Sequence, residues 1–212
     1  EARIDRPGPK LDHTSPQRAR LEEDPAPYSL PSDTLRLVST VRESILVCES
    51  RDELLVLDRA HADAIRRYEA LRDVLKSGTP KQQSLLFPDR LPLDATLRSA
   101  ISVHETWLRA IGFDWSELAE DLVVVRSVPS VVGDAPGNVT LDAALRALPK
   151  EGGSSADQAL RAIADAAAVA PGETLDPETT NRIVAAIRPS RLEHESCVRV
   201  RLPLDATQGS DA

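Results

Sequence analysis

The chain contains no methionine and only two cysteines among its 212 residues. Because methionine is missing even at position 1, we expect the chain to be a piece of a longer polypeptide. Cys48 and Cys197 are separated by most of the sequence, and each lies in an apolar, strand-like context. This spacing favours buried, reduced thiols over a disulfide framework, and it predicts a protein of the cytoplasm rather than a secreted one.

Long apolar runs and an excess of basic charge are also missing. No run approaches the ~18–20 apolar residues of a membrane span, and the polar N-terminus does not resemble a signal peptide. The formal net charge of -8 disfavours coating of DNA, which needs many contacts to phosphate. The sequence has no phosphate-binding glycine loop, dinucleotide-binding turn or serine nucleophile elbow. We therefore expect no membrane contact, at most a weak contact with DNA, and no cofactor.

The two ends of the chain are polar. Residues 1–33 hold six of the sixteen prolines, charges of both signs and almost no large apolar side chains. A segment of this composition cannot bury enough apolar surface to offset its ordering entropy. We expect a disordered, proline-rich linker at 1–33 and a frayed tail at 205–212.

The stretch from residue 37 to residue 75 organises the rest of the chain. Two apolar runs, Ile45–Cys48 and Leu54–Leu57, flank five charged or polar residues and predict a β-hairpin. From Asp58, a suitable N-cap, the apolar spacing becomes four, three and four, which is typical of one face of an α-helix. The residues of this face are Ala64, Tyr68, Leu71 and Leu75. The charged residues expected on the opposite, solvated face are Arg59, Asp63, Arg66 and Arg67.

The rest of the chain alternates between helix and strand signals. We expect helices over 94–111, from Thr140 and over 156–170, and a further helix that starts at Asp176. Strands are expected over 122–129 and 197–202, with an acidic turn at 117–121. The order is two strands and a helix, then strand, helix, strand and helix, then two helices and a strand. This order predicts an α+β fold in which the last strand returns to the sheet of the first hairpin.

The hairpin and helix, with the run Asp58-Arg59-Ala60-His61 at their junction, resemble the start of the C-terminal domain of MutL mismatch-repair proteins. The resemblance implies a discontinuous α/β sandwich, the dimerisation subdomain, formed by residues 34–80 and 156–204. A smaller α/β regulatory subdomain, residues 81–155, is then inserted between the two halves. The resemblance also implies that a variable linker joins this domain to an N-terminal ATPase, which the sequence here does not include.

Many members of that family nick DNA with metal ions, and their ligands lie in three short motifs. Asp58 and Glu69 match the first motif, and Cys197 matches the third. The positions that depart from the family pattern are Arg59, Ala60, Ala64, Asp165, Val198 and Arg199. Cations at positions 59 and 199 would repel a metal ion. The resemblance is therefore to members without nuclease activity, and we expect neither a metal site nor catalytic residues in this domain.

The segment Gln83-Ser84-Leu85-Leu86-Phe87-Pro88 resembles the Gln-x-Leu-Leu-x-Pro peptide by which many MutL C-terminal domains contact the DNA polymerase sliding clamp. An extended glutamine offers amide donors and acceptors, and two adjacent leucines can fill an apolar groove. The proline restricts the chain and lowers the ordering cost. The resemblance implies that Gln83, Leu85, Leu86 and Pro88 bind the clamp. The alternative is that this segment forms an ordinary core strand.

These observations predict a non-catalytic homodimerisation and partner-binding domain that acts in DNA mismatch repair. Its partners would be a second copy of the chain, a sliding clamp and other mismatch-repair proteins. One alternative is a metal-dependent DNA-nicking endonuclease domain with a degenerate ligand set. The other is an α+β domain that is similar to the family in structure only.

Overall fold

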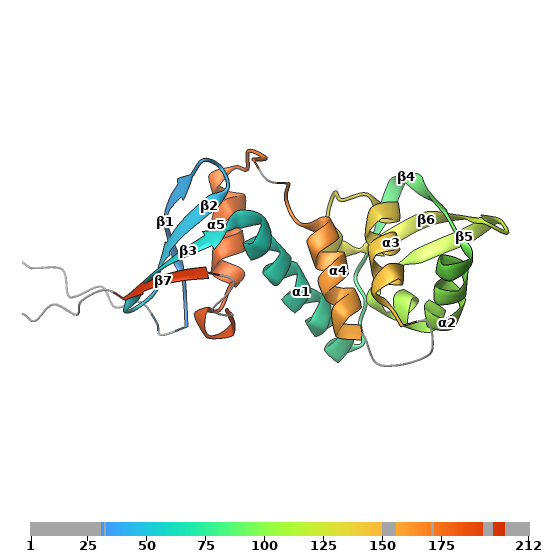
Figure 1. Ribbon diagram of the computed structural model, residues 1–212, viewed down its shortest axis with the longest axis horizontal. Helices are drawn as coiled ribbons and strands as arrows, with labels where there is room; N and C mark the ends of the chain where they lie inside the picture. Colours follow the sequence, from blue (N-terminus) through green and yellow to red (C-terminus); the bar gives the residue numbers. More distant parts are fainter. Residues whose placement is uncertain (1–30, 32, 150–155, 171, 193–196, 202–212) are drawn as a thin grey trace, which may run out of the picture.

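The computed structural model describes residues 31, 33–149, 156–170, 172–192 and 197–201. In this part of the chain, helices and two antiparallel sheets form an elongated molecule with a lobe at each end (Figure 1). The mixture of helices and antiparallel sheets confirms the predicted α+β class. Apart from Pro31 and Asp33, the predicted linker lies outside the described residues, as do the predicted tail and residues 151–155, where the predicted inserted subdomain ends.

The first lobe is built on a sheet of order β1-β2-β3-β7. Its strands are β1 (Arg36–Val41), β2 (Ile45–Glu49), β3 (Glu53–Asp58) and β7 (Cys197–Arg201). The β2–β3 hairpin is confirmed, and the backbone N–H of Ser50 donates to the carbonyl of Glu53 at 2.9 Å to close its turn. The return of the last strand is also confirmed, because β7 pairs with β3 along its whole length.

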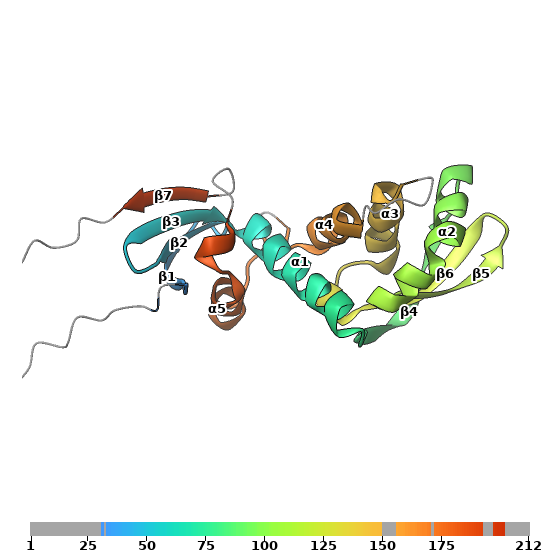
Figure 2. The same cartoon turned by 90° about the horizontal axis from the view of Figure 1, so that it is seen from below.

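Helices cover one face of this sheet. α5 (Pro177–Ala186) starts at the predicted cap, Asp176, whose carboxylate accepts from the N–H of Thr179 at 2.8 Å. In Figure 2 α5 lies along one side of the sheet, and the helix α1 (Arg59–Ser77) leaves the sheet toward the second lobe. The side chains that share this core are Leu46, Cys48, Leu55, Leu57, Ala62, Ile183, Val184 and Ile187. Burial raises the pKa of the Cys48 thiol to about 11, so this cysteine stays protonated in the folded lobe.

The helix α1 (Arg59–Ser77) joins the two lobes (Figure 1). The carboxylate of Asp58 accepts from the N–H of His61 at 2.9 Å, which confirms the predicted cap. Gly78, with φ of 64°, ends the helix in the left-handed conformation that glycine tolerates. The prediction of a solvated charged face is wrong at its start, since Arg59 and Asp63 are 1% and 0% exposed. Segments distant in sequence pack over this part of α1 and cover both side chains.

The second lobe is built on a sheet of order β4-β6-β5. Its strands are β4 (Gln82–Pro92), β5 (Asp114–Ala119) and β6 (Leu122–Pro129), and its helices are α2 (Ala95–Ile111), α3 (Gly137–Ala147) and α4 (Ala156–Ala167). The predicted helix at 94–111 and the strand at 122–129 are confirmed. The acidic turn at 117–121 is wrong in part, because residues 117–119 belong to β5 and only Glu120 and Asp121 form the turn.

A second apolar core fills this lobe and includes Phe113, Trp115, Leu108, Leu141, Leu145, Leu160 and Ile163. α4 packs against α3 and α1 and contributes to this core, so it lies with the second lobe. The subdomain boundaries stay a prediction. Thr140 is not the cap of α3, as the sequence had suggested: it lies inside the helix, and its hydroxyl donates to the carbonyl of Gly137 at 3.1 Å. Among the described residues, no helix is both long and apolar enough to cross a membrane.

Candidate functional site

The strand β4 carries a wide bulge in the middle of its pairing with β6. Gln83 and Ser84 pair with Val128 and Ser127, and regular pairing resumes only at Asp89, opposite Val125. The four residues 85–88 therefore face a single residue of β6, Arg126. Extra residues in one strand leave the ladder and bend away from it. The segment that resembles a clamp-binding peptide is thus neither a free loop nor a regular core strand, but a bulge in a sheet edge.

One side chain of the bulge is anchored in the core of the second lobe, and the other three are exposed to solvent. Leu85 is half-buried and packs against the core of the second lobe. Leu86 and Phe87 are 87% and 81% exposed, and Pro88 is also exposed. Gly137, the first residue of α3, makes this arrangement possible, because a Cβ there would lie only 2.9 Å from Cδ1 of Leu85. The fold therefore fixes the base of the bulge and leaves two large apolar side chains in solvent.

Contacts from α3 fix the end of the bulge. The carboxylate of Asp89 accepts from the N–H of Gly137 at 2.6 Å, at the N-terminus of α3 where the helix dipole favours negative charge. The side-chain amide of Asn138 donates to the carbonyl of Arg90 at 3.3 Å. Beside the bulge lies a shallow cavity of about 420 Å³, lined by residues 83–87, Asp89 and the loop 133–136. Phe87 and Asp89 were not among the binding residues expected from the sequence; a large aromatic residue next to Leu86 was the available signal for Phe87.

A second feature is the open face of the first sheet, opposite the face that α1 and α5 cover. Residues paired directly across antiparallel strands point to the same side of a sheet. The register pairs Val47 with Val56, Val56 with Val198, and Leu54 with Val200. The aliphatic side chains on this face are Val41, Ile45, Val47, Leu54, Val56, Val198 and Val200. Val198 and Val200 are 63% and 50% exposed, and we call this set the open sheet face.

The degenerate nuclease positions lie in the first lobe and along α1, but their side chains do not converge. The Asp58 carboxylate is occupied as the N-cap of α1. Glu69 lies eleven residues further along, about 16 Å by the rise of a helix, and pairs with Arg72 at 3.4 Å. Cys197 is half-buried on β7, opposite Leu57. Within the part of the chain that the structure describes, no three His, Cys, Asp or Glu side chains are grouped to hold a metal ion.

Two arginines lie near the degenerate nuclease positions in the sequence, one next to Asp58 and one two residues after Cys197. The guanidinium of Arg59 donates to the carbonyl of Glu173 and lies 4.0 Å from the carboxylate of Glu43. Arg199 pairs with Glu53 at 3.1 Å and donates to the carbonyl of Pro189 at 2.8 Å. Because buried or half-buried cations repel a divalent ion, the residues present do not fit a metal centre here.

Asp165, which stands at the second of the three nuclease motifs, lies close to α1, which carries the first motif. Asp165, on α4, lines a small cavity of about 170 Å³ together with His61, Ala64 and Tyr68 of α1. Tyr68 donates its hydroxyl to Asp157, and this hydrogen bond lowers the pKa of the Asp157 carboxyl. At this point α1 and α4 lie side by side, and the exposed His61 and Asp165 both line the cavity between them.

The chain is similar in sequence to known proteins over most of its described length. The family model described as "MutL C terminal dimerisation domain" matches residues 38–174. Three relatives carry the name "DNA mismatch repair protein MutL". The protein of a Bradyrhizobium species is 29% identical over 134 residues, which cover 63% of this chain and 21% of the relative.

The other two relatives match at similar levels. The Mesorhizobium japonicum protein is 30% identical over 94 residues, which cover 44% of this chain and 15% of the relative. The Pelobacter propionicus protein is 26% identical over 145 residues, which cover 62% of this chain and 24% of the relative. The chain thus spans less than a quarter of the length of each of these relatives.

Proposed function

Because the chain belongs to the MutL C-terminal dimerisation domain family, we propose that it acts in DNA mismatch repair, in the cytoplasm, as a non-catalytic module. In this role it joins two copies of a MutL protein, including their ATPase regions, and offers binding surfaces to a sliding clamp and other repair proteins. The observation that carries the proposal is the open sheet face, where aliphatic side chains of β1, β2, β3 and β7 line one side of a sheet whose other side is covered.

The open sheet face has the form that a two-fold dimer needs. Symmetric dimers bury the same patch of both partners, so the patch must complement itself. A sheet face that presents aliphatic side chains meets this condition, because two such faces pack together as the layers of a sandwich do. Contiguous apolar patches on soluble proteins mark interaction sites. Sedimentation equilibrium at tens of micromolar should give twice the chain mass of 23.0 kDa, whereas a persistent monomer would contradict the proposal.

The bulge of β4 is the proposed clamp contact. Leu85 and Asp89 fix the two ends of the bulge, and Leu86 and Phe87 between them are exposed to solvent. Because the segment is already ordered, it loses little conformational entropy on binding. Pro88 restricts the backbone that follows. Gln83, half-buried on the strand just before the bulge, would supply the amide contact. A short contact of this kind binds weakly, on the order of micromolar or poorer, and two copies in a dimer would raise its effective concentration.

Alanine at Leu86 or Phe87 should weaken clamp binding without loss of stability. Each side chain is exposed in the free domain and buried in the complex, so we expect affinity to fall about 10- to 100-fold. Leu85→Ala should lower the melting temperature as well, because Leu85 packs on the core. Titration calorimetry against a purified bacterial sliding clamp, paired with thermal melts, measures both effects.

Leu118→Ala is the matched control, since Leu118 is an exposed leucine of β5 in the same sheet. It should leave clamp affinity unchanged. Wild-type affinity in Leu86→Ala and Phe87→Ala, or unfolding of either variant, would remove the support for a clamp contact at the bulge.

We expect no metal-dependent nicking of DNA by this domain. Asp58 caps a helix, Glu69 is remote and paired, and Arg59 places a buried cation at the start of α1. Supercoiled plasmid incubated with the chain and manganese should stay supercoiled to the level of a protein-free control. Nicking that Asp58→Asn abolishes, and that Asp52→Asn in the exposed hairpin turn does not, would establish the endonuclease alternative instead.

A further inference from the structure

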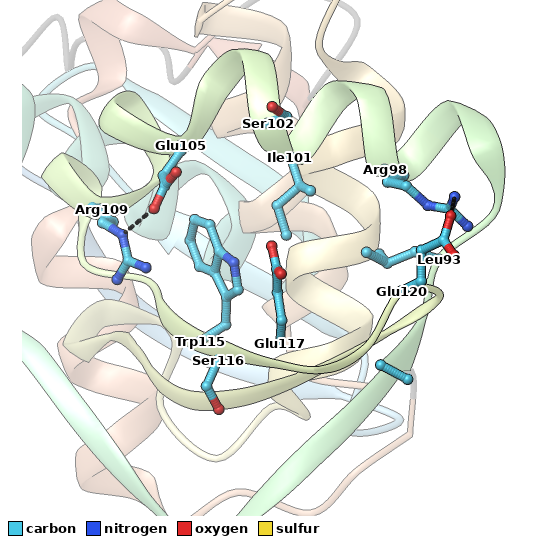
Figure 3. Close-up of a pocket in the computed structure, with 11 residues that line it drawn as sticks. Leu93, Arg98, Ile101, Ser102, Glu105, Arg109, Trp115, Ser116, Glu117 and Glu120 are labelled. Atoms are coloured by element: carbon cyan, nitrogen blue, oxygen red, sulfur yellow. Dashed lines mark hydrogen bonds and ion pairs between the residues drawn. The ribbon is translucent and has the colours of Figure 1, made fainter.

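A cavity of about 560 Å³ lies between α2 and β5, at the end of the molecule far from the first sheet (Figures 1 and 3). Its size falls within the range of about 300–1,000 Å³ that is usual for ligand pockets. The indole ring of Trp115 and the side chain of Ile101 form its apolar part, and both residues are nearly buried. Charged side chains of α2 and β5 surround this apolar part.

One wall of the cavity is a free strand edge. β5 pairs with β6 alone, since the sheet order is β4-β6-β5. Among the described residues, no backbone group of residues 115–120 takes part in a hydrogen bond outside the β5–β6 ladder and its turn. An edge strand beside a groove can accept an extended peptide as an additional strand, with main-chain hydrogen bonds for affinity and pockets for alternate side chains.

Of the three carboxylates that line the cavity, one has no ion-pair partner among the described residues. Arg109 pairs with Glu105 at 2.9 Å and with Asp114, and its guanidinium lies 4.5 Å from the centre of the Trp115 ring. Arg98 pairs with Glu120 at 2.9 Å. Both cations of the lining are thus engaged by carboxylates. Glu117 is exposed, and Figure 3 shows its carboxylate directed into the cavity beside Trp115.

The charged groups around the cavity carry a net negative charge. Three carboxylates (Glu105, Glu117 and Glu120) and two guanidinium groups line the cavity, so its formal charge balance is negative, and Asp114, which pairs with Arg109, adds a further negative charge beside it. Glu117 and Trp115 are two residues apart on β5 and point to the same side of the strand. A cation held there would meet a carboxylate on one side and an aromatic ring on the other, which is favourable on both counts.

We propose that the α2–β5 groove binds an extended segment of a second protein, which adds to β5 as a strand and places a Lys or Arg side chain between Trp115 and Glu117. This site is separate from the open sheet face and from the proposed clamp contact. The bulge lies on β4, at the opposite edge of the same sheet, so the two segments could bind at once.

Designed peptides test the proposal with the whole chain. The probe is a fluorescein-labelled, acetylated Thr-Val-Thr-Lys-Thr-Val-Thr amide, whose Val, Lys and Val side chains share one face of a strand. Fluorescence anisotropy should show binding in roughly the high micromolar range, as expected of a short linear contact. A peptide with Glu in place of Lys should bind at least about tenfold more weakly, because it adds a carboxylate to an already acidic groove.

Two N-methylated probes test the strand addition itself. Alternate N–H groups of an added strand point toward β5 and away from it. Methylation of one alternate set should therefore reduce affinity about tenfold or more, and methylation of the other set should not. Equal affinity of both methylated probes would overturn strand addition, and absence of binding by the Lys probe at millimolar concentration would overturn the site.

Variants of the chain locate the contact. Glu117→Gln should reduce affinity for the Lys probe about fivefold, as expected for the loss of one exposed ion pair. Ser102→Trp, on the exposed α2 wall, should block the groove, whereas Val103→Trp, the adjacent exposed residue outside the lining, should not. Thermal melts check that the variants are folded. Unchanged affinity in Glu117→Gln and Ser102→Trp would overturn the assignment.

A photo-crosslinking residue at position 102 identifies the occupant. Cross-links of the purified chain to its own residues 1–30 or to a second copy would overturn a segment from another protein as the natural occupant. Cross-links to the Lys probe alone support it.

Discussion

Val198→Glu is expected to turn the proposed dimer into a monomer that is still folded. Val198 is 63% exposed in the single chain, so glutamate there stays in solvent and should change the stability of the monomer by no more than about 1 kcal/mol. In the dimer the same carboxylate would be enclosed between two aliphatic sheet faces, opposite Val56 and with no cation on that face of β3 or β7. Enclosing an unpaired charge costs about 2 kcal/mol or more, and a two-fold dimer encloses two of them, so the dissociation constant should rise by about a thousandfold or more.

Sedimentation equilibrium over a range of concentrations measures this effect. Val139→Glu is the matched control, because Val139 is an exposed valine on α3 in the second lobe. It adds the same charge but should leave the dimer intact. A Val198→Glu chain that remains dimeric at low micromolar concentration would place the dimer contact elsewhere. Equal dissociation in both variants would indicate a general effect of net charge, which is already -8.

The parts of the fold that periodicity could predict are those with one buried face. The β2–β3 hairpin, α2 with its Asp94 cap and Gly112 end, and the return of β7 all follow from apolar spacing and cap residues. The strands β1 and β5 were missed, because each is a sheet edge in which polar and apolar residues alternate poorly. The bulge in β4 gave no signal of its own, since the sequence around Leu85 reads equally well as a strand or as a linear peptide.

The candidate sites were predictable to different degrees. The pattern Gln-x-Leu-Leu-x-Pro located the exposed segment, but only the fold shows that Leu85 is an anchor and that Phe87 is presented beside Leu86. The groove at β5 depends on Trp115 and Glu117 facing α2 across the sheet edge, a contact between separate elements that spacing cannot reveal. The burial of Asp63 could not be predicted from sequence spacing either, because its partners come from distant parts of the chain.

Asp63 accepts hydrogen bonds from two segments, α1 and the chain after α4, and is linked to a third segment through Arg67. Its carboxylate accepts from Arg66 at 2.6 and 2.9 Å and from Arg67 at 2.7 Å, both on α1. It also accepts from the N–H of Val169, after α4, at 3.2 Å. Arg67 in turn donates to the carbonyls of Val131 and Val132, in the 3-10 turn η1 (Ser130–Val132), at 2.6 Å each. Through this network a side chain that looked solvated in the sequence holds the second lobe against α1.

Asp63→Ala is therefore expected to be among the most destabilising single changes in the chain. Removing one partner of a buried charge network leaves the other charges uncompensated, which costs about 3–5 kcal/mol. Asp63→Asn keeps one acceptor and should cost less, while Asp73→Ala, a 73%-exposed acid on the same helix, should cost under about 0.5 kcal/mol. Urea unfolding is best measured in the Val198→Glu background, where loss of the dimer does not add to the free energy of unfolding. An Asp63→Ala chain within about 1 kcal/mol of its parent would mean that α1 and the second lobe are held by apolar contacts around Leu71 alone.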